Sequence, residues 1–232
     1  MFTAETLDFL AENRVQNSRV WYQQHRGVYL EKVVRPFAEL VEALTPAMEK
    51  IDPYFDCVPA IGHTISRINR DTRFSADKSL YRETAWCLFM RSKKLYHGLP
   101  AFFFEISPDR IRYGCGYYQA DSATLDSMRR LVLAGDKAFL AADRALKKQK
   151  FFTLEGPVYK RSRFPDQPEA LRFWLDRRDL CLMHEDADFA WLFSDRVVPT
   201  LQQAFAAAAP VYRFWLRCEE QKEVSEKIKK ST

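Results

Sequence analysis

The spacing of apolar residues over the first fifty positions predicts helices. Leu7, Phe9 and Leu10 recur at helical intervals after Thr3, and a second run with Trp21 and Tyr22 follows Ser18. Thr and Ser side chains accept hydrogen bonds from free backbone N–H groups at a helix start, so Thr3 and Ser18 are suited to cap these helices. Pro36 either kinks the second helix or opens a third.

The pattern then changes to that of strands. One alternating segment and three compact apolar runs follow each other, at residues 63–68, 85–90, 101–106 and 111–118. Links as short as residues 107–110 cannot make parallel crossovers, so we predict an antiparallel sheet. Gly114 and Gly116 form a G-x-G without the third glycine of a dinucleotide-binding fingerprint. We interpret them as a bulge or as a place where another backbone comes close.

From residue 121 the pattern is helical again. An aspartate or serine at the start, Asp121 or Ser122, can cap one helix, Gly135 ends it, and the next begins at Asp136. The spacing then predicts, in order, a loop over 151–168, a helix over 169–178, a link or strand over 179–184, a helix over 188–208 and a last helix from Pro210. We therefore predict a single α+β domain over residues 1–232, helical over 1–50, with a central antiparallel sheet over 62–118 and a helical half over 121–232.

Composition excludes several classes of protein. The net charge of +5, from 36 basic and 31 acidic residues, permits nucleic-acid binding without implying it. Five widely spaced cysteines without a C-x-x-C pair indicate neither a disulfide framework nor a zinc site, and favour a reducing, cytoplasmic compartment. No apolar run approaches the roughly 18 residues of a membrane span. We expect no membrane insertion, no metal and no cofactor.

Charge is concentrated in residues 65–83, ISRINRDTRFSADKSLYRE. Its basic residues are Arg67, Arg70, Arg73, Lys78 and Arg82, and its acids are Asp71, Asp77 and Glu83. Guanidinium groups are planar donor forks that bind a carboxylate or phosphate through two hydrogen bonds at once. Short polar side chains such as Ser75 and Ser79 favour turns. We predict a strand over residues 65–69 followed by an ordered loop.

Part of this stretch resembles a known family. RDTRFSADKSLYR, residues 70–82, is similar to the signature RDTRFS-x-DKSPYK of the domain of unknown function 2461 family, with Leu80 in place of Pro and Arg82 in place of Lys. Upstream, NSRVWY at residues 17–22 resembles the helix start NNREWF of that family. The resemblance implies one α+β domain and no assigned activity, so no catalytic residue follows from it.

We expect a basic pocket for an anionic small molecule. The candidate ligands of its phosphate or carboxylate group are Arg67, Arg70, Arg73, Lys78, Tyr81 and Arg82. Possible contributors are Arg19, Trp21, Tyr113, Tyr117 and, from a second basic patch, Lys160 and Arg161. If the pocket performs chemistry, Asp71 or Asp77 would be its acid or base. The sequence contains no recognisable nucleophile with a partner, so it leaves open whether the protein is an enzyme.

Two alternatives remain. In the first, the charges of residues 65–83 neutralise each other in an internal ion-pair network, and the protein is a structural or interaction module. In the second, the two basic patches bind nucleic acid weakly, which we rank last because acids are interleaved with the bases. Replacement of Arg73 by Ala separates pocket from network, because loss of a partner in a buried network lowers stability strongly.

Overall fold

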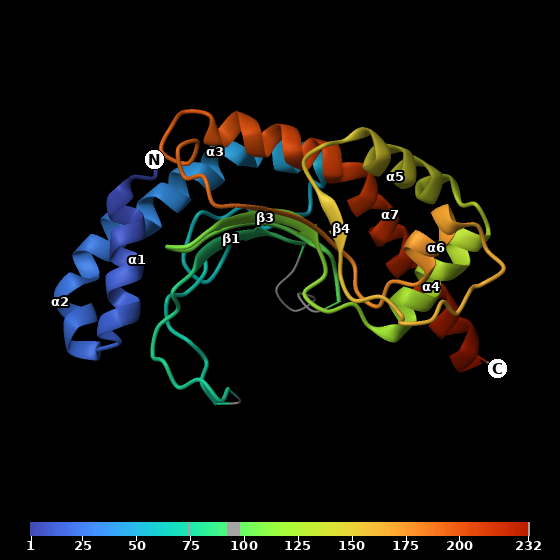
Figure 1. Cartoon of the computed structure of the whole chain (residues 1–232), viewed down its shortest axis with the longest axis horizontal. Coiled ribbons are helices and arrows are strands. Elements are labelled where there is room, and N and C mark those ends of the chain that lie inside the picture. Colours follow the sequence, from blue (N-terminus) through green and yellow to red (C-terminus); the bar gives the residue numbers. More distant parts are fainter. Residues whose placement is uncertain (74, 92–97, 232) are drawn as a thin grey trace. The chain divides into compact units, whose positions relative to one another are not determined.

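The computed structural model describes residues 1–73, 75–91 and 98–231, with side chains up to residue 222 (Figure 1). Its internal contacts divide the chain into two compact units. Unit 1 consists of residues 1–89, 103–113 and 185–203, and unit 2 consists of residues 90–102, 114–184 and 204–232. Each unit is therefore assembled from segments that are distant in the sequence.

The N-terminal part of unit 1 is helical, as predicted. It contains α1 (Ala4–Gln16), α2 (Arg19–Tyr29), the π-helical turn η1 (Leu30–Val34) and α3 (Arg35–Ile51). Thr3 is the N-cap residue of α1, and Ser18 Oγ accepts a hydrogen bond from Trp21 N at 3.4 Å. Both predicted caps are confirmed. Asn17 adopts the left-handed conformation, with φ of 41°, which ends α1 directly before α2 begins.

Pro36 accounts for the π-helical turn. A proline has no backbone N–H, and its ring crowds the carbonyl four residues earlier, which is that of Lys32. In η1 the backbone hydrogen bonds span five residues instead of four, and Arg35 N donates to Leu30 O. The carbonyl of Lys32 accepts a hydrogen bond from Thr6 Oγ1 at 2.7 Å, and Thr6 is fully buried on α1. Pro36 therefore opens α3, and Thr6 satisfies a carbonyl near the junction.

The sheet is antiparallel, as predicted, with the strand order β1-β2-β3-β5-β4. Its strands are β1 (Ala85–Phe89), β2 (Ala101–Ile106), β3 (Ile111–Gly116), β4 (Thr153–Glu155) and β5 (Cys181–Asp186). Leu154 of β4 lies opposite Leu182 of β5, and both side chains are buried. Together with the helices, the sheet makes the fold α+β.

Two details of the predicted sheet need correction. It extends beyond residue 118, because β4 lies within residues 151–168, which were predicted to be loop, and β5 continues it. The three residues of β4 are too short a run for alternation to be recognised. Residues 63–68 do not form a continuous strand. They make isolated bridges instead, among them Ile65 with Cys87.

Unit 2 is largely helical. It contains α4 (Ser122–Leu133), α5 (Lys137–Lys148) and α6 (Glu169–Leu175), and α7 (Val197–Ser231) continues into it from unit 1. Asp121 Oδ1 accepts from Thr124 N at 2.7 Å, and Asp136 Oδ1 accepts from Ala138 N at 2.8 Å. These contacts identify Asp121 as the predicted cap of α4 and Asp136 as the N-cap of α5. Gly135, with φ of +63°, separates α4 from α5 as expected.

The predicted C-terminal helices were wrong in their boundaries. No helix begins at Asp188, because residues 188–196 are turns in which Asp188 Oδ1 and Ser194 Oγ bond to backbone N–H groups nearby. Helix α7 starts at Val197 and passes through Pro210 instead of restarting there. Burial of the flanking Val211, Tyr212, Phe214 and Trp215 offsets the hydrogen bond that the proline removes.

Aromatic rings dominate the core of each unit. In unit 1, Phe37 lies edge-on to Phe2 with ring centroids 5.0 Å apart, and Phe104 packs beside both. In unit 2, the ring centroid of Phe139 lies 5.8 Å from that of Trp174 and 5.6 Å from that of Phe214. Each such ring buries a large apolar area, which is why an aromatic-rich chain can form two separate cores.

Candidate functional site

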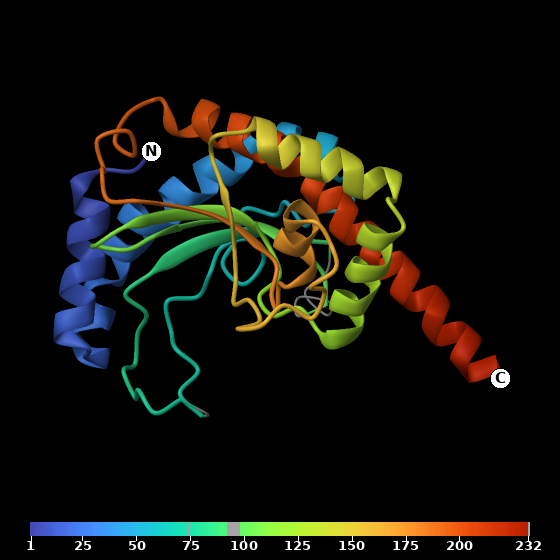
Figure 2. The ribbon, with the colours of Figure 1, turned by 45° about the vertical axis from the view of Figure 1, so that its right-hand side comes forward.

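The basic stretch forms a hairpin in unit 1, which we call the arginine hairpin, residues 67–82. Asn69 bridges Tyr81 in antiparallel fashion, Arg70 N donates to Leu80 O at 3.0 Å, and Arg82 N donates to Ile68 O at 2.7 Å. Residues 71–79 form the tip, which extends away from β1 in both views (Figures 1 and 2). Isolated bridges at Ile65 and Asn69 stand where a strand was predicted. Phe74, within this tip, lies outside the described residues.

The charged side chains of the tip pair with each other. Arg70 Nη1 lies 2.6 Å from Asp77 Oδ2, and Arg73 Nη2 lies 2.6 Å from Asp71 Oδ2. Lys78 Nζ donates to the carbonyl of Thr72 at 2.8 Å. The Arg73 and Asp71 side chains are 77% and 52% exposed, so water screens their attraction strongly. The hairpin thus contains local ion pairs at the surface.

These pairs decide what the two candidate acids can do. The side-chain hydrogen bond from Arg73, joined by its backbone N–H, lowers the pKa of Asp71 to about 2. The hydroxyl and backbone N–H of Ser79, together with the charge of Arg70, lower the pKa of Asp77. A carboxylate with a lowered pKa is a weak proton acceptor at neutral pH. The geometry therefore supports a counter-ion role for Asp71 and Asp77.

The cations nearer the base of the hairpin are held differently. Arg67 is exposed and makes no hydrogen bond or ion pair among the described residues. Its Nε and Nη2 atoms lie 3.3 Å from the point where a Cβ on Gly62 would stand, so the guanidinium rests against that turn. Arg82 lies over the ring of Trp86, 4.8 Å from the centroid. Tyr81 is buried, with its ring 4.8 Å from that of Tyr22.

The two segments that carry the family resemblance contact each other. Asn17 Oδ1 accepts a hydrogen bond from Leu80 N at 2.8 Å, and the Tyr22 ring packs on Tyr81. Next to them, Arg14 Nη1 lies 2.9 Å from Asp109 Oδ2 and 3.4 Å from Glu83 Oε2. The junction of α1 and α2 therefore holds one arm of the hairpin.

Arg19 and Trp21 lie at the start of α2. Arg19 is exposed and has no hydrogen bond or ion pair in the part of the chain that the structure describes. The Trp21 ring stacks on His25 with centroids 4.1 Å apart and lies beside Phe9. His25 is half-buried, and its Nδ1 lies 2.8 Å from the carbonyl of Trp21. Their contribution to a site stays a prediction.

The remaining predicted contributors are spread over both units. Tyr113, in unit 1, is buried beside Trp191, and burial raises its pKa to about 12. Tyr117 belongs to unit 2 and is buried there, whereas Lys160 and Arg161 are exposed residues of unit 2. Their cooperation with the arginine hairpin stays a prediction. The interpretation of the glycines is confirmed at Gly116, where a Cβ would stand 2.5 Å from Leu180 O.

Sequence reasoning missed a buried polar group in unit 2, which we call the Glu219 cluster. Glu219 Oε1 accepts from Tyr117 Oη at 2.9 Å and from Thr124 Oγ1 at 2.7 Å, and Lys222 Nζ lies 3.2 Å from Oε2 and 2.5 Å from Asp121 Oδ2. Burial, followed by the charge of Glu219, raises the pKa of Tyr117 well above 10.0. These contacts fasten α7 to α4 and to the end of β3.

Asn13 was missed as well. Its side chain is fully buried on α1, and neither its Oδ1 nor its Nδ2 atom has a hydrogen-bond partner among the described residues. A buried amide without partners destabilises a protein. The signal was present in the sequence, since Asn13 continues the spacing of Thr6, Phe9 and Leu10 along the buried face of the helix.

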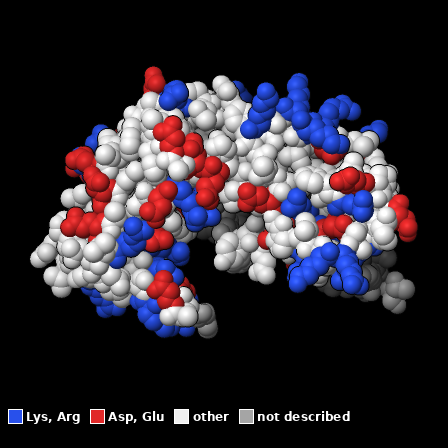
Figure 3. Space-filling model, viewed as in Figure 1, with Lys and Arg blue, Asp and Glu red and all other residues white. Residues whose placement is uncertain are grey.

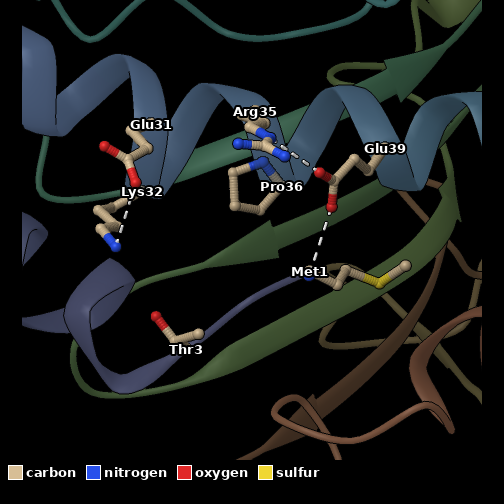
Figure 4. Close-up of a pocket in the computed structure, with 7 residues that line it drawn as sticks. All are labelled: Met1, Thr3, Glu31, Lys32, Arg35, Pro36 and Glu39. Atoms are coloured by element: carbon tan, nitrogen blue, oxygen red, sulfur yellow. Dashed lines mark hydrogen bonds and ion pairs between the residues drawn. The ribbon is translucent and has the colours of Figure 1, made fainter.

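A small depression in unit 1, shown in Figure 4, is separate from the hairpin. It is lined by Met1, Thr3, Glu31, Lys32, Arg35, Pro36 and Glu39. The N-terminal amine lies 3.3 Å from Glu39 Oε2, Arg35 Nε lies 3.1 Å from Glu39 Oε1, and Lys32 Nζ lies 3.4 Å from Glu31 Oε1. Its charged groups pair with one another, and none of the predicted site residues lines it.

The described residues offer neither a metal site nor a membrane-spanning helix. Among the side chains of residues 1–73, 75–91 and 98–222, no three from His, Cys, Asp or Glu are close enough to hold a metal ion. His184, near the cysteine of β5, has its Nδ1 atom 2.8 Å from the carbonyl of Phe151. Over the same residues, no helix is both long and apolar enough to cross a lipid bilayer.

Comparison with protein families decides the affiliation of the chain. The family model described as a conserved hypothetical protein, domain of unknown function 2461, matches residues 5–214. The chain belongs to this family. The match includes the arginine hairpin, the α1–α2 junction that fixes it and most of unit 2. No curated protein matches the chain. The description of the family names no activity.

Proposed function

We propose that unit 1 binds an anionic small molecule, bearing a phosphate or carboxylate group, at the arginine hairpin. The observation that supports the proposal is that the guanidinium of Arg67 is available to a ligand. Its guanidinium is exposed and has no partner among the described residues, whereas Arg70 and Arg73 are paired with Asp77 and Asp71. Five basic side chains stand against two carboxylates in residues 67–82, so the hairpin keeps an excess of positive charge.

The expected affinity is that of a weak metabolite or substrate site. A charge-assisted hydrogen bond contributes roughly 1.5 to 3 kcal/mol, and one guanidinium fork can make two of them. Two such bonds correspond to a dissociation constant on the order of 1 mM. A cation that exchanges its partner for the ligand would tighten binding. Arg73 is suited to this role because it is the most exposed member of the pairs at the tip.

A second candidate is an interaction module in which the hairpin has a structural role. The Arg70–Asp77 and Arg73–Asp71 pairs favour it, since they neutralise part of the charge internally. Binding of nucleic acid is the weakest candidate, because acidic residues are interleaved with the basic ones in residues 65–83 and the net charge is only +5.

A reducing, cytoplasmic compartment is part of the proposal, and the five free thiols are consistent with it.

Calorimetric titration tests the proposal. Inorganic phosphate, sulfate and citrate are titrated into the wild-type protein, Arg67→Ala and the control Arg26→Ala, which removes an exposed arginine of α2 in the same unit. We expect saturable binding of at least one anion, a loss of roughly 10-fold or more in Arg67→Ala, and no change in the control. Equal affinities in wild type and Arg67→Ala, or no saturable binding of any of these anions, would contradict the proposal.

A further inference from the structure

A basic cluster in unit 2 lies around the ring of Tyr159, on a loop that its neighbours hold firmly. Val158 bridges Arg177 in antiparallel fashion, Tyr159 N donates to Asp176 O at 3.0 Å, and Arg178 N donates to Pro157 O at 2.8 Å. At the start of the loop, Gly156 has φ of +118°, and a Cβ there would stand 2.7 Å from Asp179 O. The backbone therefore fixes where the Tyr159 ring can lie.

Three arginines surround this ring. Their Cζ atoms lie 4.1 Å from the ring centroid for Arg163, 5.6 Å for Arg129 and 5.8 Å for Arg178. The negative face of a tyrosine ring attracts guanidinium groups at such distances. Because both distances end at one ring, the Cζ atoms of Arg163 and Arg178 are no farther apart than the sum of their two distances from its centroid. Their mutual repulsion acts within one screening length, which is about 8 to 10 Å at moderate salt.

Arg129 is committed to the fold. It is buried, its Nε donates to Leu175 O at 3.0 Å and its Nη2 to Arg177 O at 2.9 Å, and its Nη1 lies 2.9 Å from Asp126 Oδ1. Arg163 and Arg178 are exposed instead, and neither guanidinium has a hydrogen bond or ion pair within the described residues. Two donor forks beside one ring are thus unoccupied.

Among the described residues, no carboxylate lies within ion-pair distance of either guanidinium. Asp126 pairs with Arg129, and Asp176 Oδ1 accepts from the backbone N–H of Arg163 at 3.1 Å. Lys160 and Arg161, on the same loop, are exposed and add further positive charge. Figure 3 shows basic side chains gathered over α4 and the loop before α6. The cluster therefore carries an excess of positive charge at a rigid position.

We propose that Arg163 and Arg178, ordered by Tyr159, form a binding site in unit 2 for a phosphate group. A tetrahedral phosphate offers enough oxygens to accept hydrogen bonds from two guanidinium forks at once. An anion between the forks also relieves the repulsion of the clustered cations. Lys160 and Arg161 then belong to this site. It is separate in sequence from the arginine hairpin and does not depend on the function proposed there.

Phosphate titration followed by NMR tests the inference on the full chain. Inorganic phosphate is added to the wild-type protein, Arg163→Ala, Arg178→Ala, Arg163→Lys and the control Arg144→Ala, an exposed arginine of α5. We expect saturable shifts of the Tyr159 signals, affinities weakened roughly 10-fold or more in both alanine variants, an intermediate loss in Arg163→Lys, and no change in Arg144→Ala. Unchanged melting temperatures would show that the alanine variants remain folded.

The same signals distinguish this site from the hairpin. Arg67→Ala is expected to leave the shifts of Tyr159 unchanged, whichever way the test of the hairpin turns out. A single-stranded oligonucleotide that binds more tightly than phosphate, with strong salt dependence, would identify a phosphodiester chain as the source of the group. No advantage of the oligonucleotide would identify an isolated phosphate. Wild-type Tyr159 signals that do not saturate, or affinities equal in Arg163→Ala, Arg178→Ala and wild type, would overturn the inference.

Discussion

The arginine hairpin of unit 1 and the Glu219 cluster of unit 2 use similar ion pairs in opposite surroundings. The Arg73 side chain is 77% exposed, whereas those of Glu219 and Lys222 are 10% and 17% exposed. Water screens the first pair, so it contributes little to stability. The Glu219 cluster is largely removed from water, so the loss of any one of its hydrogen-bond partners lowers stability. The hairpin is rich in charged residues, yet its exposed ion pairs contribute little to the stability of the fold.

Loss of Glu219 should have the largest effect. Glu219→Ala leaves Lys222, Tyr117 and Thr124 without their shared acceptor, and we expect a loss of about 3 to 5 kcal/mol in the free energy of unfolding. Glu220→Ala is the matched control. Glu220 is next to Glu219 in the sequence, but its side chain is 68% exposed, and its Oε2 atom lies 3.4 Å from Arg217 Nη1. Urea unfolding measures both. Equal losses of unfolding free energy in Glu219→Ala and Glu220→Ala would show that the buried Glu219 cluster is no more important for stability than an exposed ion pair.

Tyr117 makes the stability of the Glu219 cluster depend on pH. The pKa of Tyr117 is raised in the folded state, so its contribution to the free energy of unfolding is present below pH 10.0, the ordinary pKa, and is lost as the pH rises above that value. Tyr117→Phe should therefore lose stability at neutral pH, roughly 1.5 to 3 kcal/mol for a hydrogen bond to a charged group. Above pH 10 the difference between wild type and variant should narrow. A constant difference across this range would argue against the buried phenol.

Asn13 gives a smaller effect of opposite sign. Asn13→Leu replaces a buried amide without partners among the described residues by an apolar side chain of similar size, which should stabilise unit 1 by roughly 1 to 2 kcal/mol. Asn69→Leu, at an exposed position of the hairpin, is the control and should not stabilise the protein. Thermal unfolding compares the two. Destabilisation by Asn13→Leu would mean that the amide has a partner or a role in unit 1.

The smallest effect is expected at the tip of the hairpin. Arg73→Ala should change the melting temperature by no more than about 2 °C, because the pair with Asp71 is screened by water. The pKa of Asp71 is lowered, so any stabilisation by this pair is present above the ordinary pKa of 3.8 and is lost as pH falls toward 2. Calorimetry at pH 7 and pH 3 measures it. A large drop at pH 7 would favour the interaction-module alternative.

The sequence predicted those features that rest on local chemistry. Caps at Thr3, Ser18 and Asp121, the start of a helix at Asp136, and the close backbone approach at Gly116, follow from residue type and short spacing. The antiparallel sheet followed from the short links between strands. The basic composition of the hairpin was visible too, but which arginines pair with which carboxylates depends on the turn at its tip.

Features that rest on distant partners were not predicted. Tyr117 and Glu219 are 102 residues apart, so neither residue shows its role locally. Pro210 was expected to begin a helix, yet the packing of the aromatic residues after it keeps α7 continuous. The Tyr159 cluster combines Arg129, Arg163 and Arg178 from three separate segments. Its basic loop was recognisable, but the ring that gathers the cations was not.

NMR signals of arginine Nε–H groups would show directly whether Arg67 binds an anion. Phosphate is titrated into labelled protein at constant ionic strength, and the Arg67 signal is assigned by its absence in Arg67→Lys. If the hairpin binds phosphate as proposed, the Arg67 signal shifts saturably, before or together with that of Arg73, while the signal of exposed Arg26 does not move. An Arg67 signal that stays in place, or one that drifts without saturation as the Arg26 signal does, would show that the hairpin does not bind the anion.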